Sequence, residues 1–436
     1  MDFKRLLSYS EPDTRGKRRL PWIYIPTTYF AEGLPYTIII ITLAVIYQNM
    51  GVSNAQIAFW TSMLYLPWVI KMFWGPLVDC YLSKRSWIII TQYIMGALFI
   101  GASLIMESEY FFFGSLSVFA TMSFISATHD IATDGFYMLS LSKDQQAFFV
   151  GIRSQFYRLA MWFGQGLLLV FTGWLMSRGY GAALSWTLGL CLCAVVFLML
   201  AQFHYWYLPY PVSDLRTKNK QTGQTRRSFI NVFTSYFRQD KILAILGFIL
   251  LYRLGESMLT KIVPLFLLGD LTDGGLGLST VDVGIIQGTV GLISLSAGGI
   301  LGGIVIARFG LRKCIWPMAL ALNIPDIFYI FLAYIKPALI YVYGAVALEM
   351  FGYGFGFAAF MVFLMFIAKG EYKTSHFAIS TGLMALGMMI PGMVSGFLQE
   401  YLGYTMFFIA VALFTIPGML LIFIIPLDEN NENAAA

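Results

Sequence analysis

The chain has 436 residues, of which 58% are hydrophobic and 12% are charged, and its formal net charge is +5. A soluble domain usually carries about 25% charged residues, and no soluble fold could keep this much apolar surface away from water. The composition therefore excludes a soluble protein and indicates one that crosses a membrane many times.

A helix that crosses hydrocarbon about 30 Å thick needs about 20 apolar residues, and the sequence contains twelve such runs. The polar first twenty residues argue against a cleavable signal peptide, so the first run should remain as helix 1. The predicted crossings are 22–48, 56–79, 86–106, 111–141, 149–177, 182–208, 241–268, 280–307, 313–335, 338–368, 375–399 and 402–426.

The positions of lysine and arginine predict the orientation, because cytoplasmic loops retain positive charge. With both termini in the cytoplasm, 21 of the 28 basic residues fall on the cytoplasmic side. The net charge therefore reflects topology and contact with anionic lipid, and it gives no support for nucleic-acid binding. Five basic residues remain inside predicted helices: Lys71, Arg153, Arg158, Arg253 and Lys261.

A long polar segment after the sixth crossing divides the chain into two groups of six crossings. Gly51–Ala58 before helix 2 resembles Gly277–Gly284 before helix 8, which indicates an internal repeat. We therefore predict an all-α membrane protein with two pseudo-symmetric six-helix halves. Its expected parts are a cytoplasmic tail (1–21), the N-terminal bundle (22–208), a cytoplasmic linker (209–240), the C-terminal bundle (241–426) and a second cytoplasmic tail (427–436).

A glycine followed by basic residues ends the second helix of each half: Gly75 precedes Lys84 and Arg85, and Gly303 precedes Arg312 and Lys313. Together with the two halves, this pattern resembles the major facilitator superfamily. The resemblance implies a cytoplasmic gate motif made of Gly75, Asp79, Lys84 and Arg85. Topology alone could also explain the basic residues.

Helix 4 carries the densest group of ionisable residues, His129, Asp130 and Asp134, and helix 5 returns with Arg153 and Arg158. A charge at membrane depth costs a few kcal/mol, so each should face a cavity or a partner. In an antiparallel hairpin, Asp134 and Arg153 should lie at the same depth in the membrane, and so should Asp130 and Arg158. The group is either a set of buried salt bridges or a proton-coupling gate, and His129 is either part of it or a hydrogen-bonded packing residue.

Helix 1 places Glu32 about ten residues, roughly 15 Å, into the membrane, and helix 7 places Arg253 at a comparable depth, followed by Glu256 and Lys261. A carboxylate opposite an arginine would suit a proton site beside an anion site. The alternative is a central salt bridge without a ligand role. Lys71, Asp326 and Glu349 are weaker candidates, since a lysine can snorkel and Asp326 follows Pro325.

Aromatic residues recur in helices 1, 2 and 10 and could stack on sugar rings, although packing and interfacial anchoring would explain them equally well. The substrate-binding candidates from all these groups are Tyr29, Glu32, Tyr36, Tyr65, Trp68, Arg253, Glu256, Lys261 and Tyr353.

A more specific likeness rests on helices 1, 2, 4 and 5. The motifs are Gly33–Pro35, Gly51–Ser53, Leu66–Lys71, Trp74–Asp79, Ala127–Asp134 and Tyr157–Leu159. They resemble the AmpG-type muropeptide permeases and the related acetyl-coenzyme A transporters. The resemblance implies import of cell-wall-derived anhydro-muropeptides (N-acetylglucosaminyl-anhydro-N-acetylmuramyl peptides) by proton symport with alternating access, in an inner membrane. The family usually has glutamine where this chain has His129.

Other functions remain open at this level. A carrier for another large organic anion, such as a coenzyme A thioester, or for an oligosaccharide is one alternative, and a membrane sensor that has lost transport is another. We expect no enzyme activity, because His129, Asp130 and Asp134 have no clear nucleophile beside them. We expect no cofactor and no metal, since the cysteines and histidines lie far apart, and a monomer, because the fold forms its pathway without a partner.

Overall fold

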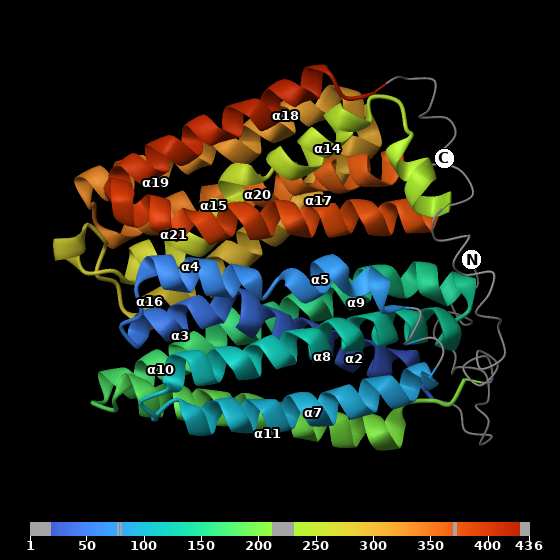
Figure 1. Ribbon diagram of the computed structural model, residues 1–436, viewed down its shortest axis with the longest axis horizontal. Coiled ribbons are helices and arrows are strands. Elements are labelled where there is room, and N and C mark those ends of the chain that lie inside the picture. Colours follow the sequence, from blue (N-terminus) through green and yellow to red (C-terminus); the bar gives the residue numbers. More distant parts are fainter. Residues whose placement is uncertain (1–18, 76–77, 79–80, 212–230, 369–372, 428–436) are drawn as a thin grey trace. The chain divides into compact units, whose positions relative to one another are not determined.

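The computed structural model describes residues 19–75, 78, 81–211, 231–368 and 373–427. Within these ranges the regular structure is helical, and no strand occurs. Contacts divide the chain into two compact units, which Figure 1 shows with their labelled elements. Unit 1 contains Met1–Met50 and Ile70–Lys220, and unit 2 contains Gly51–Val69 and Gln221–Ala436.

Unit 1 consists of long helices, two of which contain a short π-helical segment. Its elements in chain order are α2 (Pro21–Thr37), η1 (Ile38–Thr42), α3 (Leu43–Asn49), η2 (Lys71–Phe73), α7 (Lys84–Ile105), α8 (Phe111–Ser140), α9 (Lys143–Trp162), η3 (Phe163–Leu167), α10 (Leu168–Ser177) and α11 (Ala182–Tyr207).

Unit 2 begins with the first part of helix 2 and continues through the C-terminal half of the chain. Its elements are α4 (Asn54–Met63), α5 (Leu66–Ile70, whose last residue belongs to unit 1), α14 (Ile242–Leu251), α15 (Leu254–Leu268), η5 (Leu271–Asp273), α16 (Thr280–Val283), η6 (Gly284–Gly291), α17 (Leu292–Phe309), α18 (Leu311–Asn323), η7 (Ile324–Asp326), α19 (Ile327–Ile335), α20 (Leu339–Ile367), α21 (Lys373–Leu420) and η8 (Leu421–Phe423).

The number of crossings agrees with the sequence. Among the described residues, ten helical segments are long and apolar enough to cross a membrane. One of them, α21, contains two crossings, because Gly403 has a non-helical backbone (φ 72°, ψ 165°) in its interior. The twelfth crossing is helix 2, which is interrupted between α4, α5 and η2. The predicted all-α protein of twelve transmembrane helices is therefore confirmed.

Side-chain caps fix several helix starts. Ser142 and Gln145 form a reciprocal capping box at the start of α9, which satisfies two backbone donors that a helix end leaves open. The helix therefore begins at Lys143, six residues before the predicted start at residue 149. The predicted start is too late because the apolar pattern of this helix begins several residues after its cap.

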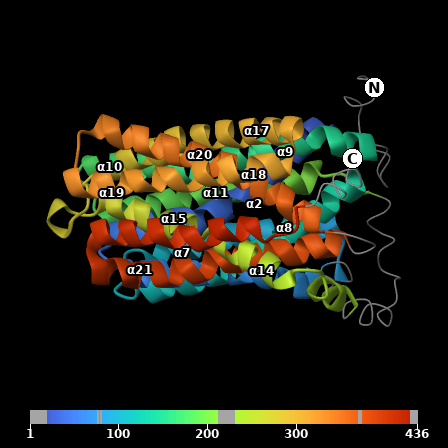
Figure 2. The ribbon, with the colours of Figure 1, turned by 90° about the horizontal axis from the view of Figure 1, so that it is seen from above.

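Glycine allows close approach of helices in both units. In unit 1, a methyl group at Gly33 of α2 would lie 2.9 Å from the Tyr157 carbonyl of α9. In unit 2, α17 and α20 lie side by side (Figures 1 and 2), and a methyl group at Gly354 would lie 2.1 Å from the Leu295 carbonyl. The glycine run of helix 10 therefore serves close helix packing.

The end of the predicted linker is helical at residues 231–237 and packs on α21. The Tyr236 hydroxyl lies 2.8 Å from Ser380 Oγ, and Ser235 Oγ lies 2.9 Å from His376 Nε2. Burial raises the pKa of Tyr236. This part of the linker therefore anchors to the C-terminal bundle.

Candidate functional site

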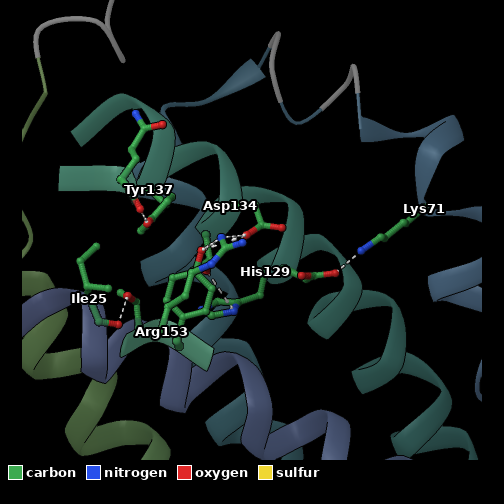
Figure 3. A network of polar contacts seen from close by, with 11 residues as sticks. Ile25, Lys71, His129, Asp134, Tyr137 and Arg153 are labelled. Atoms are coloured by element: carbon green, nitrogen blue, oxygen red, sulfur yellow. Dashed lines mark hydrogen bonds and ion pairs between the residues drawn. The ribbon is translucent and has the colours of Figure 1, made fainter. Parts of the chain in front are cut away.

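Three ionisable side chains from three elements of unit 1 meet beside α8. Lys71 of η2 donates to Asp130 Oδ2, and the charge of Asp130 acts on the buried Glu32 carboxyl group. Figure 3 shows Lys71 pointing toward α8. The Asp130 side chain is only 13% exposed, whereas Lys71 is 36% exposed. Two acids and one base thus form what we name the α8 acid site: Glu32, Asp130 and Lys71.

Two carboxylates that act on each other in the protein interior are costly to ionise together. The Lys71 ammonium stabilises charge on Asp130, so Glu32 is the acid that is easier to protonate. Glu32 Oε2 is buried and receives no hydrogen bond from any donor among the described residues. The geometry of the α8 acid site therefore suits uptake of a proton at Glu32.

A second polar group lies one helical turn along α8. Tyr29 donates to Asp134 Oδ1 over 2.9 Å, and Arg153 Nη1 donates to both Tyr29 (2.7 Å) and Asp134 (3.1 Å). The guanidinium also lies over the Tyr29 and Tyr137 rings, 5.2 and 4.8 Å from their centres. The structure brings Asp134 and Arg153 together as the depth argument expects, and Figure 3 shows Arg153 directed at Asp134. Both charges are partly exposed, so the pair contributes modest stability.

Two other candidates of unit 1, Tyr36 and Arg158, lie on α2 and α9. The Tyr36 ring lies 6.1 Å from the Tyr157 ring, centre to centre. Arg158 is half-buried on α9. Asp130, which the depth argument matches with Arg158, has Lys71 as a bonded cation, and Lys71 stood among the weaker candidates.

His129 is fully buried and belongs to a hydrogen-bonded chain across four helices, α8, α7, α11 and α2. Gln92 Nε2 of α7 donates to His129 Nε2 (2.9 Å), and His204 Nδ1 of α11 donates to Gln92 Oε1 (2.8 Å). Thr27 Oγ1 of α2 lies 2.9 Å from His204 Nε2, and His129 Nδ1 lies 3.4 Å from Thr133. If the Gln92 amide is turned over, it still donates to one imidazole and accepts from the other. Both imidazoles are therefore satisfied in their neutral forms.

The predicted gate motif is described in part. Asp79 lies outside the described residues, and Gly75 has open space at its Cβ position. Arg85 donates to the Tyr205 and Leu208 carbonyls and covers the Tyr210 ring at 3.8 Å. These carbonyls end α11, so Arg85 acts as its C-terminal cap.

The neighbouring lysine of the motif packs against α8. A methyl group at Gly135 would lie 2.7 Å from Lys84 Cε, so glycine leaves room for the lysine stem. Lys84 is 5% exposed despite its charge.

In unit 2, Arg253 occupies the break between α14 and α15 and is buried. It donates to the Tyr353 hydroxyl and lies over the Tyr353 and Phe357 rings, 5.0 and 4.7 Å from their centres. Its Nε is buried without an acceptor among the described residues. A guanidinium framed by aromatic rings can bind a carboxylate beside a sugar.

The remaining candidates of unit 2 lie on α15 and helix 2. Glu256 is buried and accepts a hydrogen bond from Thr260 over 3.0 Å, and its charge acts on the carboxyl group of Glu349. Lys261 donates to Thr61 over 3.2 Å and lies 5.6 Å from the centre of the Tyr65 ring. Trp68 is half-buried on α5.

Sequence reasoning missed Gln92 and His204 as partners of His129. The available signal was a lone polar residue inside each apolar run, since a buried polar group needs a partner. Among the described residues, no group of three histidine, cysteine or acidic side chains could hold a metal ion.

Comparison with known proteins places this geometry in a family. Residues 27–375 match the model of the Major Facilitator Superfamily. The chain is 27% identical to an uncharacterized Haemophilus influenzae protein, covering 94% of this chain and 95% of that protein. It is 25% identical to the anhydromuropeptide permease of Escherichia coli K12, covering 91% of this chain and 77% of the permease. These relatives support the AmpG-type resemblance.

Among solved structures, a D-xylose-proton symporter is similar, with a TM-score of 0.68, 12% identity, and coverage of 92% of this chain and 95% of the symporter. At this identity the likeness concerns the fold alone. The expected major facilitator fold is confirmed.

Proposed function

Because the chain belongs to the Major Facilitator Superfamily, and is therefore a multi-pass membrane transporter rather than an enzyme, we propose that it imports cell-wall-derived anhydro-muropeptides together with protons. The substrate class is supported by the permease of E. coli, whose similarity extends over 91% of this chain. The location that goes with this proposal is an inner membrane with both termini in the cytoplasm.

The observation that carries the proton coupling is the α8 acid site. A proton on Glu32, with Lys71 paired to Asp130, leaves the group close to neutral. Loss of that proton would leave two carboxylates facing one ammonium in a low-dielectric interior, which is costly. Gain of a second proton would neutralise Asp130 and break its ion pair with Lys71. Either step changes the contact between η2 and α8, which is the mechanical consequence that coupling requires.

The substrate side of the proposal rests on Arg253. An anhydro-muropeptide carries carboxylates on its peptide and N-acetylated sugar rings. The Arg253 guanidinium can pair with a carboxylate, and the rings of Tyr353 and Phe357 offer faces for a sugar. Arg253→Lys would keep the charge but lose the planar donor geometry, so it should weaken substrate binding without loss of folding.

The test is uptake of labelled anhydro-muropeptide by proteoliposomes, with and without an inward proton gradient. Asp130→Asn should abolish gradient-driven accumulation but retain counterflow exchange, because only the coupling group has changed. Glu107→Gln is the matched control, since Glu107 is an exposed acid between α7 and α8. Unchanged accumulation in Asp130→Asn would refute the coupling role. Counterflow with a coenzyme A thioester, but not with anhydro-muropeptide, would refute the substrate.

A further inference from the structure

A second carboxyl pair lies inside unit 2, on helices that the coupling scheme above does not use. Glu256 of α15 and Glu349 of α20 are each only 2% exposed, and the charge of Glu256 acts on Glu349. Two carboxyl groups that act on each other in the protein interior are too costly to ionise together, so one of them is expected to hold a proton.

The surroundings indicate which partner holds that proton. Thr260 donates to Glu256 Oε1 over 3.0 Å, and the Arg253 charge acts on Glu256. Both favour a charged Glu256 carboxylate. Glu349 accepts a hydrogen bond from the Tyr329 hydroxyl, 3.2 Å from its Oε2. Because the guanidinium of Arg253 acts on Glu256, Glu349 is the acid that we expect to carry the proton.

A third buried acid in the same cluster is an independent indication of a bound proton. Asp326 of η7 is 2% exposed, and its Oδ1 has no hydrogen-bond donor among the described residues. Its Oδ2 lies 3.2 Å from the Cβ position of Gly255, beside Glu256, and its charge acts on both glutamates. The titratable groups acting on the pair from neighbouring elements are thus Arg253, Asp326 and Tyr329. One guanidinium cannot balance three acids, so the cluster needs at least one proton to be stable in the interior.

The two pairs occupy equivalent places in the internal repeat. Glu32 and Asp130 lie on the first and fourth crossings, and Glu256 and Glu349 lie on the seventh and tenth. In each pair one acid has a nearby cation, Lys71 or Arg253, and the other holds the proton. We propose that Glu256 and Glu349 form a second proton-binding site, the repeat counterpart of the α8 acid site. This inference uses the transporter family but does not depend on the substrate or on coupling through Asp130.

The test is infrared spectroscopy of the purified full-length protein, with the carbonyl stretching band of protonated carboxyl groups followed in water and in heavy water. Glu349→Gln should remove one band, and Glu32→Gln should remove a different one. The amide of Glu349→Gln can donate to Glu256 and accept from Tyr329, so the fold should persist. Glu107→Gln, an exposed acid, should change neither band.

If Glu349→Gln does not fold, the variant Tyr329→Phe provides an independent test of the second site. This variant removes the hydrogen bond to Glu349 and should shift its band without deleting it. A wild-type spectrum in Glu349→Gln, or in Tyr329→Phe, would overturn the second site. A band that disappears on addition of sodium ions would also overturn it, because the occupant would then be a metal cation. Loss of the Glu349 band from Glu349→Gln, with the Glu32 band unchanged, would support the second site, because each band would then belong to its own acid.

Discussion

Replacement of Lys71 by methionine tests the electrostatics of the α8 acid site most directly. The change keeps the length of the side chain but removes the only ammonium bonded to Asp130 among the described residues. Fully buried ion pairs cost about 3–5 kcal/mol when one partner is removed, and exposed pairs contribute about 0–1 kcal/mol. With the two side chains 36% and 13% exposed, we expect Lys71→Met to lower the free energy of unfolding by about 2 kcal/mol.

The same variant should acquire a pH dependence of defined sign. Without Lys71, the folded state is most stable when both Glu32 and Asp130 carry protons, whereas the unfolded chain releases them at about pH 4. The folded state then binds more protons than the unfolded state, so stability falls as pH rises, by up to about 1.4 kcal/mol per pH unit for each extra proton. Acidification should therefore restore part of the lost stability.

The assay is a double-mutant cycle of Lys71→Met and Asp130→Asn, followed by denaturant unfolding in detergent at several pH values. The double variant should be about as stable as Asp130→Asn alone, because the uncompensated charge is gone, and the coupling energy should be about 2 kcal/mol. Additivity within about 0.5 kcal/mol would mean that the two groups do not interact in solution. That result would refute the ion pair as the organising contact of the site.

Two further predictions concern packing. Gln92→Leu should lower the free energy of unfolding by about 2–4 kcal/mol, since it leaves His129 Nε2 and His204 Nδ1 without their Gln92 partner in the protein interior; thermal unfolding of Gln92→Leu beside Gln92→Glu checks this, and an effect below about 1 kcal/mol would show that the bridge is not formed. Gly396→Ala should cost about 1–3 kcal/mol by overpacking, because the new methyl group would lie 2.4 Å from the Asn54 carbonyl of α4; Gly101→Ala, which meets open space, is the matched control, and equal stability of the two variants would contradict the close contact of α4 with α21.

The sequence predicts the crossings well, because the bilayer imposes one length and one composition on every span. It also predicts the Asp134–Arg153 pair, since a short hairpin fixes the relative depth of its two helices. It ranked Lys71 too low, because snorkelling explains a single lysine without reference to a partner. The interruption of helix 2 at Leu64–Tyr65 and the pairing of Glu256 with Glu349 depend on contacts between residues distant in sequence. No local periodicity contains that information.

The two parts of helix 2 belong to different units. Its first part, α4, is bound within unit 2: Asn54 donates to Gln399 over 2.7 Å, and the Ala55 amide donates to Glu400 over 2.8 Å. Its later part is bound within unit 1, where Lys71 pairs with Asp130. The unit assignment changes at Ile70, next to Lys71. We therefore expect protonation of Asp130 to remove the Lys71 ion pair and to weaken the contact of the later part of helix 2 with α8, whereas the contacts of α4 inside unit 2 do not involve Asp130.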